Sequence, residues 1–593
     1  ATQLFTPEWI VRYMVENSLG RLWMLNNPGS SLRERMEYYI EPDAEHEDFI
    51  RISSPEEITL CDPACGSGHI LVYAFELLFH MYEERGYRER EIPELILTKN
   101  LAGMEIDSRA AQIAELALAM CAREHDRRFF KRAARADVTV LSSIPLGDDE
   151  LPGNKKLAEE LSHLGEIGSL LNPSEGEIDE LKVAAANCSD DLFASATKTK
   201  LENAAAICEK LSRRFTCTVA NPPYMGSSSF NPFMSKWVKK NYSDVKSDLC
   251  TCFIERGFSL AKDRGYAAMV TMQSWMFLGS FEKIRAKVID NKTIVSMAHL
   301  GPRAFDAIGG EVVNVTADVI YNGRAAYEGA YVRLVDINGS EAKRLKLVEA
   351  IQNPACGWFY RRDADTFKQI PGTPIAYWAS DRFINLFSDL ITRYSVANEG
   401  IKTGDNDRFL KYWFEVSECQ TNIRKRRLSP KWHITAKAGE SRKWYGSHYV
   451  VTNFANNGAE MIATGHASIT GISNLYKPAI TWNRIGSGRL SFRYLPAGFL
   501  SNMGGLCMYS QSGQGDSQLA LLSFLNSSIV ALEHEMLNPS TSFPPGTINS
   551  IGCGDVDINR GDVKEICSAA ISQAMLDWDS FETSWDFKRH PLL

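Results

Sequence analysis

The stretch TVANPPYMG, from Thr218 to Gly226, combines residue types that can do chemistry. Asn221 carries a side-chain amide, and two prolines and Tyr224 follow it. The prolines leave the backbone almost no freedom and remove two donors, so the apolar run before them must turn. A backbone this rigid also keeps its hydrogen-bond acceptors aimed at one point. The stretch is either a strand-ending turn or a clamp built from Asn221, Pro222 and Tyr224.

A glycine-rich stretch, DPACGSGH from Asp62 to His69, indicates where a ligand approaches the backbone. Gly66 and Gly68 stand between a short apolar run and a helical pattern, and glycine permits such a close approach. Asp62 would repel a pyrophosphate but attract an ammonium group. No GxxxxGKS or GxxxxGKT sequence occurs to favour a phosphate. The loop therefore favours a zwitterionic ligand over NAD or ATP.

Acidic residues follow two further apolar runs. Glu105, in GMEID, is expected to accept hydrogen bonds from two ribose hydroxyls, with Ile106 packed against an adenine face. Asp137 is interpreted as following the third strand, where it would accept a bond from the adenine amino group. Taken singly, a helix cap for Asp107 and a turn for Asp137 are equally good interpretations. Three acids at three successive strand ends favour a nucleoside site.

Alternating strand and helix patterns position these motifs. EEITLCDPACGSGH with the helix after it forms one βα unit, and LTKNLAGMEID with SRAAQIAELALAMCAREHD forms a second. They predict a doubly wound, mostly parallel sheet with ligands at the carboxyl ends of its strands. Residues 146–212 are charged, Ala-rich and helical in pattern, which predicts a helical insertion. From about residue 370, shorter segments rich in Gly, Trp, Tyr and Asn predict a separate α+β domain.

Composition excludes several classes of protein. The 593 residues carry a formal net charge of -8, so any nucleic-acid partner must be held by a local basic surface. Thirteen cysteines without a CxxC pair indicate free thiols in a reducing compartment and argue against a zinc ribbon. No apolar run approaches the roughly 20 residues that span a bilayer, and no signal peptide is evident. A cytoplasmic protein with no membrane association is predicted.

Together these motifs resemble the class I S-adenosylmethionine (AdoMet) dependent methyltransferases, and within them the gamma group of DNA adenine amino-methyltransferases. The order QLFTPEWIVRYM, DPACGSGH, NPPY is the order of that group. With the late segment FLNSSIVALEHEMLNPSTSFPPGTI, the chain looks like the PglX-like adenine methyltransferases of BREX phage-defence systems, which are related to type IIG restriction-modification enzymes. Such proteins carry further sequence on both sides, so this chain is interpreted as their central portion. His69 and the FPPG near residue 543 depart from the expected pattern.

The resemblance implies a fold and a division into domains. The expected fold is Rossmann-like α/β, with a seven-stranded mixed sheet, helices on both faces, and a C-terminal α+β target recognition domain. The expected boundaries are residues 1–345 for the methyltransferase domain, with its insertion at about 146–212, residues 346–375 for a linker, and residues 376–593 for the recognition domain. The oligomeric state is left open.

The resemblance also implies a reaction at an adenine amino group flipped out of double-stranded DNA. Methyl transfer from a sulfonium needs no metal, but the amine must be held in line with the methyl group. The Asn221 side-chain oxygen and the Pro222 carbonyl would hold both amino hydrogens, and Tyr224 would stack on the extruded base. The implied catalytic residues are Asn221, Pro222, Pro223 and Tyr224. The implied AdoMet-binding residues are Thr6, Pro7, Asp62, Ala64, Cys65, Gly66, Gly68, Glu105, Ile106 and Asp137.

Basic residues gather in two regions that suit contacts with phosphates. Runs of this kind are usually solvated faces, but clustering in an acidic protein favours nucleic-acid contact. In related recognition domains, segments like TGDNDRFL and WNRIGSGRLSFRY lie near the DNA. Asn406 and Arg484 from these segments are therefore added to the expected DNA-binding residues. The expected DNA-binding residues are Lys236, Lys239, Lys240, Asn406, Arg424, Arg426, Arg427 and Arg484.

Two alternative functions use the same motifs. A methyltransferase acting on RNA or on protein glutamine also uses NPPY, although such enzymes are commonly smaller than this chain. A second alternative is an AdoMet-responsive DNA-binding subunit of a defence complex, active only alongside partner proteins. The intact Asn221, Pro222 and Tyr224 weigh against loss of chemistry.

Overall fold

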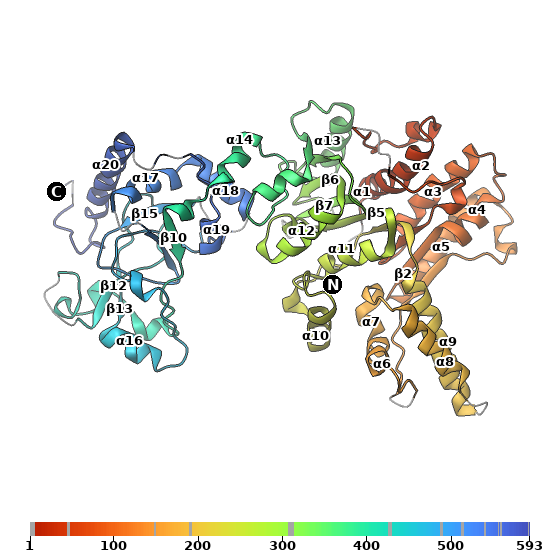
Figure 1. Ribbon diagram of the computed structural model, residues 1–593, viewed down its shortest axis with the longest axis horizontal. Helices are drawn as coiled ribbons and strands as arrows, with labels where there is room; N and C mark the ends of the chain where they lie inside the picture. Colours follow the sequence, from red (N-terminus) through yellow and green to blue (C-terminus); the bar gives the residue numbers. More distant parts are fainter. Residues whose placement is uncertain are drawn as a thin grey trace. The chain divides into compact units, whose positions relative to one another are not determined.

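Buried side chains gather into separate cores before and after Lys368, and a computed structural model divides the chain into two units, Ala1–Lys368 and Gln369–Leu593 (Figure 1). The structure describes residues 6–43, 48–147, 150–188, 192–305, 313–424, 430–486, 490–511, 515–538, 541–555, 557, 560–590 and 592. Each unit is described by itself.

Nine strands form one mixed sheet in the described residues of the first unit, in the order β3-β2-β1-β4-β5-β7-β6-β8-β9. The predicted seven-stranded mixed sheet is confirmed in the first seven of these, and β8 and β9 extend it. β1 to β5 run parallel, and β7 lies antiparallel between β5 and β6. The strands are β1 (Leu60–Asp62), β2 (Leu101–Glu105), β3 (Asp137–Val140), β4 (Phe215–Ala220), β5 (Ala261–Met272), β6 (Thr293–Gly301), β7 (Val315–Tyr321), β8 (Glu328–Arg333) and β9 (Phe359–Asp363).

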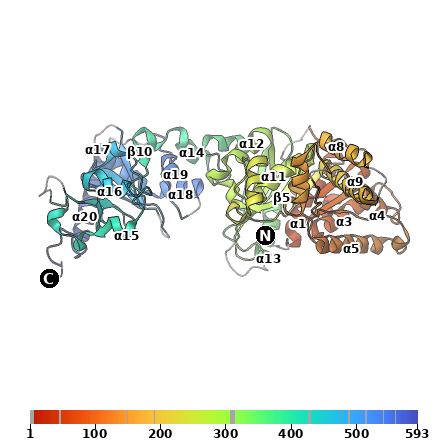
Figure 2. The ribbon, with the colours of Figure 1, turned by 90° about the horizontal axis from the view of Figure 1, so that it is seen from below.

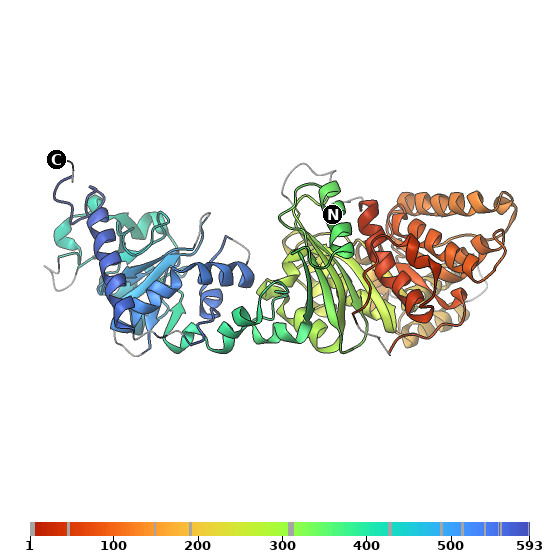
Figure 3. The same cartoon turned by 90° about the horizontal axis from the view of Figure 1, so that it is seen from above.

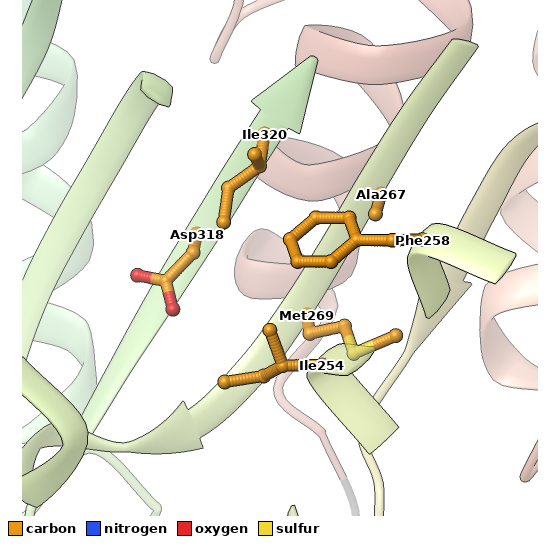
Figure 4. Close-up of a pocket in the computed structure, with 6 residues that line it drawn as sticks. All are labelled: Ile254, Phe258, Ala267, Met269, Asp318 and Ile320. Atoms are coloured by element: carbon orange, nitrogen blue, oxygen red, sulfur yellow. The ribbon is translucent and has the colours of Figure 1, made fainter. Parts of the chain in front are cut away.

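Helices cover both faces of this sheet, so its central strands are continuous apolar runs. In β5, Tyr266 and Ala268 face the core that includes α1, while Ala267 and Met269 on the other face meet Phe258 of α11 (Figure 4). Figure 3 shows the red N-terminal helices against one side of the green strands. The helices outside the insertion are α1 (Glu8–Val15), α2 (Arg21–Asn26), α3 (His69–Glu84), α4 (Ile92–Leu95), α5 (Ser108–His125), α10 (Pro232–Asn241), α11 (Leu249–Leu260), α12 (Glu282–Asn291) and α13 (Ser340–Gln352).

The segment between β3 and β4 is helical. Its elements are α6 (Lys155–Ser162), α7 (Leu164–Ile167), the short helix η6 (Gly168–Leu170), α8 (Glu175–Ala186) and α9 (Leu192–Ser212), and α8 and α9 lie side by side (Figure 2). Ser169 of η6 donates its hydroxyl to the Pro63 carbonyl at 2.5 Å, and Arg256 of α11 donates from Nε to the Ser169 carbonyl at 2.7 Å. These buried bonds tie the insertion to the loop that follows β1.

The boundary between the units falls inside the predicted linker, but much of that segment belongs to the first unit. The expected linker, residues 346–375, includes the end of α13 and all of β9, which pairs with β8 as an edge strand of the sheet. The first unit therefore reaches Lys368. Residues on both faces of β9 are half-buried or exposed, so this edge strand has no run of buried apolar residues, and its mixed sequence resembles that of a linker.

The second unit is an α+β fold, as predicted. Its described residues form two four-stranded sheets, ordered β10-β17-β14-β15 and β11-β13-β12-β16. The strands are β10 (Ser395–Asn398), β11 (Leu410–Tyr412), β12 (Trp432–Ala436), β13 (Val450–Asn453), β14 (Ala479–Asn483), β15 (Phe492–Leu495), β16 (Leu500–Ser501) and β17 (Gly505–Ser510). The helices are α14 (Asp381–Ile384), α15 (Asn406–Phe409), α16 (Ala455–Ile462), α17 (Gly515–Leu525), α18 (Ser528–Leu537), α19 (Pro545–Asn549) and α20 (Gly561–Trp578). Across the described part of both units, none of the helices combines the length and the apolar character that crossing a membrane requires.

Candidate active site

The motif loops meet at the carboxyl edge of the sheet. Asp62 ends β1, Glu105 ends β2, and Asn221 directly follows β4. Because β1 pairs in parallel with both β2 and β4, these three strands end at the same edge. Open parallel sheets bind their ligands at this edge.

The loop after β1 is shaped by backbone hydrogen bonds and two left-handed glycines. Gly66 has φ +51° and Gly68 has φ +86°, conformations that side chains disfavour. The Cys65 N–H donates to the Met104 carbonyl at 3.0 Å, which fastens the loop to β2. A Cβ added to Gly68 would lie 2.9 Å from the Cβ of Ala114 on α5, so this glycine also permits close helix packing.

Two acids lie beside this loop, within the sheet edge. Asp62 is only 1% exposed, and its Oδ1 accepts a hydrogen bond from the Ala64 N–H at 3.1 Å. Burial, together with the nearby charge of Glu105, raises the pKa of Asp62 to about 8. Glu105 is 9% exposed, and its Oε2 accepts from the Gly66 N–H at 2.8 Å. A buried pair of carboxylates is stabilised by a positively charged ligand, so these residues fit an ammonium or sulfonium group.

Glu105 also organises the residues that follow it. Its Oε1 accepts hydrogen bonds from the N–H groups of Ile106 and Asp107, both at 2.9 Å. Asp107 caps α5 by accepting from the Arg109 N–H at 2.9 Å, which was its alternative interpretation. The Ile106 side chain is 51% exposed at the mouth of the loop. An apolar group in this position is available to cover a flat ligand.

Asp137 does not belong to this edge, and its predicted position is wrong. β3 begins at Asp137, which pairs with Ala102 near the start of β2, so Asp137 lies at the amino edge. Its carboxylate accepts from Lys210 Nζ at 2.8 Å and from Arg213 Nη1 at 2.6 Å. Burial alone would raise the pKa of Asp137, but these two cations lower it below its ordinary value.

The NPPY stretch forms a hydrogen-bonded chain with the N-terminal segment. Asn221 donates from Nδ2 to Thr6 Oγ1 at 2.9 Å, and the Tyr224 hydroxyl donates to Asn221 Oδ1 at 2.8 Å. Burial raises the pKa of Tyr224 well above its ordinary value, so the hydroxyl keeps its proton and remains a donor. The Asn221 amide is thus oriented from both sides.

The first helix positions Thr6 and Pro7, which precede it directly. α1 is anchored across the sheet, because the Tyr13 hydroxyl donates to Ser296 Oγ on β6 at 2.8 Å and Trp9 Nε1 donates to Ser340 Oγ at 3.0 Å. Both bonds are buried. α1 therefore holds Thr6 against a loop that lies far away in the sequence.

The loop after NPPY is fastened by residues that sequence reasoning missed. The Leu249 N–H donates to the Met225 carbonyl at 2.9 Å, and Gly226 bridges to Asp248. Asp248 also caps α11 by accepting from the Cys250 N–H at 3.0 Å. The signal was present, since an Asp directly before an apolar helical run is an N-cap pattern.

A further buried acid, Asp318 on β7, lies within the sheet. It accepts hydrogen bonds from Thr271 Oγ1 at 3.0 Å, Trp275 Nε1 at 3.1 Å and Thr316 Oγ1 at 2.9 Å. Burial raises the pKa of Asp318 to about 7. The cavity beside it has a volume of about 10 Å³, room for about one water molecule, and is lined mostly by apolar side chains (Figure 4). It is a packing gap and not a substrate pocket.

In the second unit, two of the predicted DNA-binding residues come together. Asn406 and Arg484 line a cleft of about 420 Å³, with Lys402, Thr403, Lys437 and Asn502. Among the other predictions, Lys236, Lys239 and Lys240 are exposed on α10, and Arg424 pairs with Glu418 at 2.8 Å. Arg426 and Arg427 lie outside the described residues.

Comparisons with known proteins are consistent with these motifs. Residues 99–305 match the family described as Eco57I restriction-modification methylase. The whole chain is similar to the adenine-specific methyltransferase BrxX of Escherichia coli O9:H4 (strain HS), with 36% identity over 643 residues, and to the adenine-specific methyltransferase PglX of Lacticaseibacillus casei (strain Zhang), with 35% identity over 640 residues. The alignments cover 100% of this chain and 52% and 53% of those relatives, so this chain spans about half of their length.

Two solved structures share the fold. A nuclease-deletion mutant of the type ISP restriction-modification enzyme LlaGI, in complex with a DNA substrate mimic, aligns with a TM-score of 0.54 and 12% identity, over 96% of this chain and 47% of that one. The type IIL restriction-modification enzyme MmeI, in complex with DNA, aligns with a TM-score of 0.52 and 14% identity, over 99% and 73% of the respective chains.

Proposed function

Because this chain is a homologue of adenine-specific methyltransferases over its full length, we propose that it transfers a methyl group from AdoMet to the exocyclic amino group of adenine in double-stranded DNA, at a specific sequence. The observation that carries the proposal is the shared sheet edge: the oriented Asn221 amide and the buried acids Asp62 and Glu105 all lie there. The acids suit a cationic methyl donor, and the amide suits an amine that receives the methyl group.

The residues around the first loop would hold AdoMet, which supplies the electrophilic methyl group when bound. Asp62 would pair with its ammonium group, and Glu105 would accept from the ribose hydroxyls through Oε2, which has a second lone pair beside the one that takes the Gly66 N–H. Ile106 would cover the adenine ring. Thr6, Pro7 and the backbone of residues 64–68 would border the methionine end.

Asn221 and Pro222 would hold the target amine. The carbonyl oxygen of an amide has two lone pairs, so the Asn221 Oδ1 that accepts from Tyr224 is of a kind that can accept an amino hydrogen as well. The Pro222 carbonyl would take the second hydrogen. Holding both hydrogens draws the nitrogen lone pair out of the ring and towards the methyl group, which is catalysis by positioning and local charge. The base must leave the duplex to reach these groups, and Tyr224 would stack on it.

The proposal is tested with the purified chain, AdoMet and a DNA library, followed by sequencing that detects methylated adenine. We expect one recognition sequence to carry N6-methyladenine, and Asn221→Ala to abolish methylation while AdoMet binding, measured by calorimetry, stays the same. Methylation by the Asn221→Ala variant at the wild-type rate would overturn the clamp. Methyl transfer to RNA or protein in place of DNA would contradict the proposal that DNA is the substrate.

The biological setting extends the same proposal. The first unit would carry the reaction and the second, Gln369–Leu593, would recognise the DNA sequence. The methylation would mark host DNA in a phage-defence or restriction-modification system, alongside other proteins of that system, in the cytoplasm where the DNA lies. Sequencing a host with and without the gene tests this role, because loss of the modified sequence must accompany loss of the gene.

A further inference from the structure

The cleft in the second unit gathers positive charge from three distant segments. Lys402 precedes α15, Lys437 follows β12, and Arg484 follows β14. The whole protein has a net charge of -8, so three cations around one cleft are a local exception. Of these three cations, only Arg484 has an ion-pair partner within the described residues, and that partner is Glu399 at 3.2 Å.

Lys437 has an unbalanced charge. Its side chain is half-buried, and burial lowers the pKa of Lys437 below its ordinary value. No carboxylate within the described part of the chain pairs with it or with Lys402. Partial burial of an ammonium group costs free energy unless an anion compensates it, so the cleft is short of an anion.

The neutral groups of the cleft also present donors. Thr403 donates from Oγ1 to Asn406 Oδ1 at 2.6 Å, which leaves the two hydrogens of the Asn406 amide directed elsewhere. Asn502 Oδ1 accepts from the Gly504 N–H at 3.0 Å, and the Gly504 carbonyl accepts from the Arg484 N–H at 3.2 Å. Each of these acceptors already takes a hydrogen bond from the protein, whereas the Asn406 amide and the three cations present donors, so the cleft suits a ligand that is anionic and rich in acceptors.

The backbone along one side of the cleft is closely packed. Ile401 bridges to Asn502, and a Cβ at Gly400 would lie 2.5 Å from the Asn502 backbone nitrogen. Close backbone packing of this kind holds the backbone beside Lys402 in place. A backbone that is already fixed loses little loop entropy when a phosphate binds.

We infer that this cleft binds the phosphate backbone of the target DNA, with Lys402 and Lys437 as phosphate contacts beside Asn406 and Arg484. The inference rests on the proposed function and assigns two residues that no motif indicated. A cleft of about 420 Å³, open at the exposed Lys402 and Asn406, admits a continuous strand as well as a small anion.

The test measures binding of the full 593-residue chain to a fluorescent DNA duplex between about 50 and 200 mM salt. The variant is Lys402→Gln with Lys437→Gln, and the control is Lys477→Gln with Lys588→Gln, which removes the same charge from exposed positions outside the cleft. We expect the cleft variant to bind about 25-fold more weakly and its salt slope to fall by about 1.8, because each phosphate contact contributes about 0.9. Its AdoMet affinity should match that of the wild type, and its thermal midpoint should not fall below the wild-type value, because the variant loses an uncompensated, half-buried charge.

The outcomes separate the inference from the proposed function. If the wild type methylates DNA but the cleft variant keeps the affinity and salt slope of the control, the inference is wrong and the proposed function stands. If the wild type neither binds nor methylates DNA, both are wrong. Saturable binding of inorganic phosphate that is lost in the cleft variant, with DNA affinity unchanged, would assign the cleft to a small anion and overturn the inference.

Discussion

Asn221 Nδ2 donates to Thr6 Oγ1 at 2.9 Å although the two residues are separated by 215 positions in the sequence. The bond fixes the orientation of the side-chain amide. Its nitrogen faces Thr6, and its Oδ1 faces the Tyr224 hydroxyl. Thr6 was expected only to line the cofactor. The geometry makes it a positioning residue for the amide as well.

Thr6→Val should slow methyl transfer more than it weakens AdoMet binding. Valine has the shape of threonine but cannot accept the hydrogen bond, so the Asn221 amide loses one of the bonds that orient it. We expect kcat to fall by about 10- to 100-fold, the scale of a misplaced reacting group, with the KM for AdoMet nearly unchanged. Thr6→Ser keeps the oxygen and should restore most of kcat. Equal kcat values for the Val and Ser variants would contradict the positioning role.

Tyr224 contributes a ring and a hydroxyl, and two variants separate them. Tyr224→Phe keeps the stacking face and loses the hydroxyl, which bonds to Asn221 Oδ1 and, at 3.4 Å, to the Val270 carbonyl, so we expect a loss of a few-fold in kcat/KM. Tyr224→Ala loses the face, and stacking on an aromatic side chain is worth about 1–3 kcal/mol per base, or about 5- to 150-fold. Base extrusion, followed by 2-aminopurine fluorescence, should fall in the Ala variant alone. A larger loss in the Phe variant would show that the hydroxyl dominates.

AdoMet binding should depend on pH through Asp62, whose pKa burial raises to about 8. An ammonium ligand needs the carboxylate, so affinity should rise with pH by up to about tenfold per unit below 8. The unliganded protein should behave oppositely: because the folded pKa exceeds the unfolded value near 3.9, the stability from the protonated acid is present below pH 4 and lost as pH rises through about 8. Calorimetry across pH 6 to 8 checks this, and Asp62→Asn should bind more weakly with a flatter profile.

Asp137→Asn and Glu105→Gln should have different effects. Asp137 lies at the amino edge with Lys210 and Arg213, so its change should leave AdoMet affinity unaltered and cost less than about 1 kcal/mol of stability, the usual value of a partly exposed ion pair. Glu105→Gln exchanges a double acceptor for an amide beside Gly66 and should weaken AdoMet binding. Calorimetry measures the AdoMet affinity of both variants, and thermal unfolding measures their stability. Weakened AdoMet binding in the Asp137→Asn variant would restore its predicted role.

The two loop glycines should tolerate alanine unequally. At Gly66 an added Cβ meets nothing within 4 Å, so Gly66→Ala carries only the cost of a left-handed side chain, about 1–2 kcal/mol. At Gly68 the Cβ would also lie 2.9 Å from Ala114, and overpacking adds about 1–3 kcal/mol. Denaturant unfolding should rank Gly68→Ala as the less stable variant. The reverse order would mean that α5 moves away at little cost.

Local patterns predicted the elements well where one short stretch contains the whole signal. The βα units around Asp62 and Glu105 show as an apolar strand, a turn and a helix, and the sheet confirms them. Asp137 was misplaced because an acid at the start of a strand and an acid at its end look alike locally. What distinguishes them is a pair of cations 73 and 76 positions away. The predicted linker, residues 346–375, took in β9 for a related reason, since β9 is recognisable as a strand only beside β8.

The sequence by itself determined which residue types stand at the sheet edge. NPPY and DPACGSGH are short and rigid, and each dictates its backbone through proline and glycine, so their acceptors and turns need no distant partner to be recognised. Only the tertiary structure decided what orients them and where further charge gathers: Thr6 against Asn221, Asp248 beneath Gly226, and Lys402 with Lys437 across the cleft. The physical reason is that hydrogen bonds and burial act over a few ångströms in space, whereas these pairs are far apart along the chain and share no periodicity.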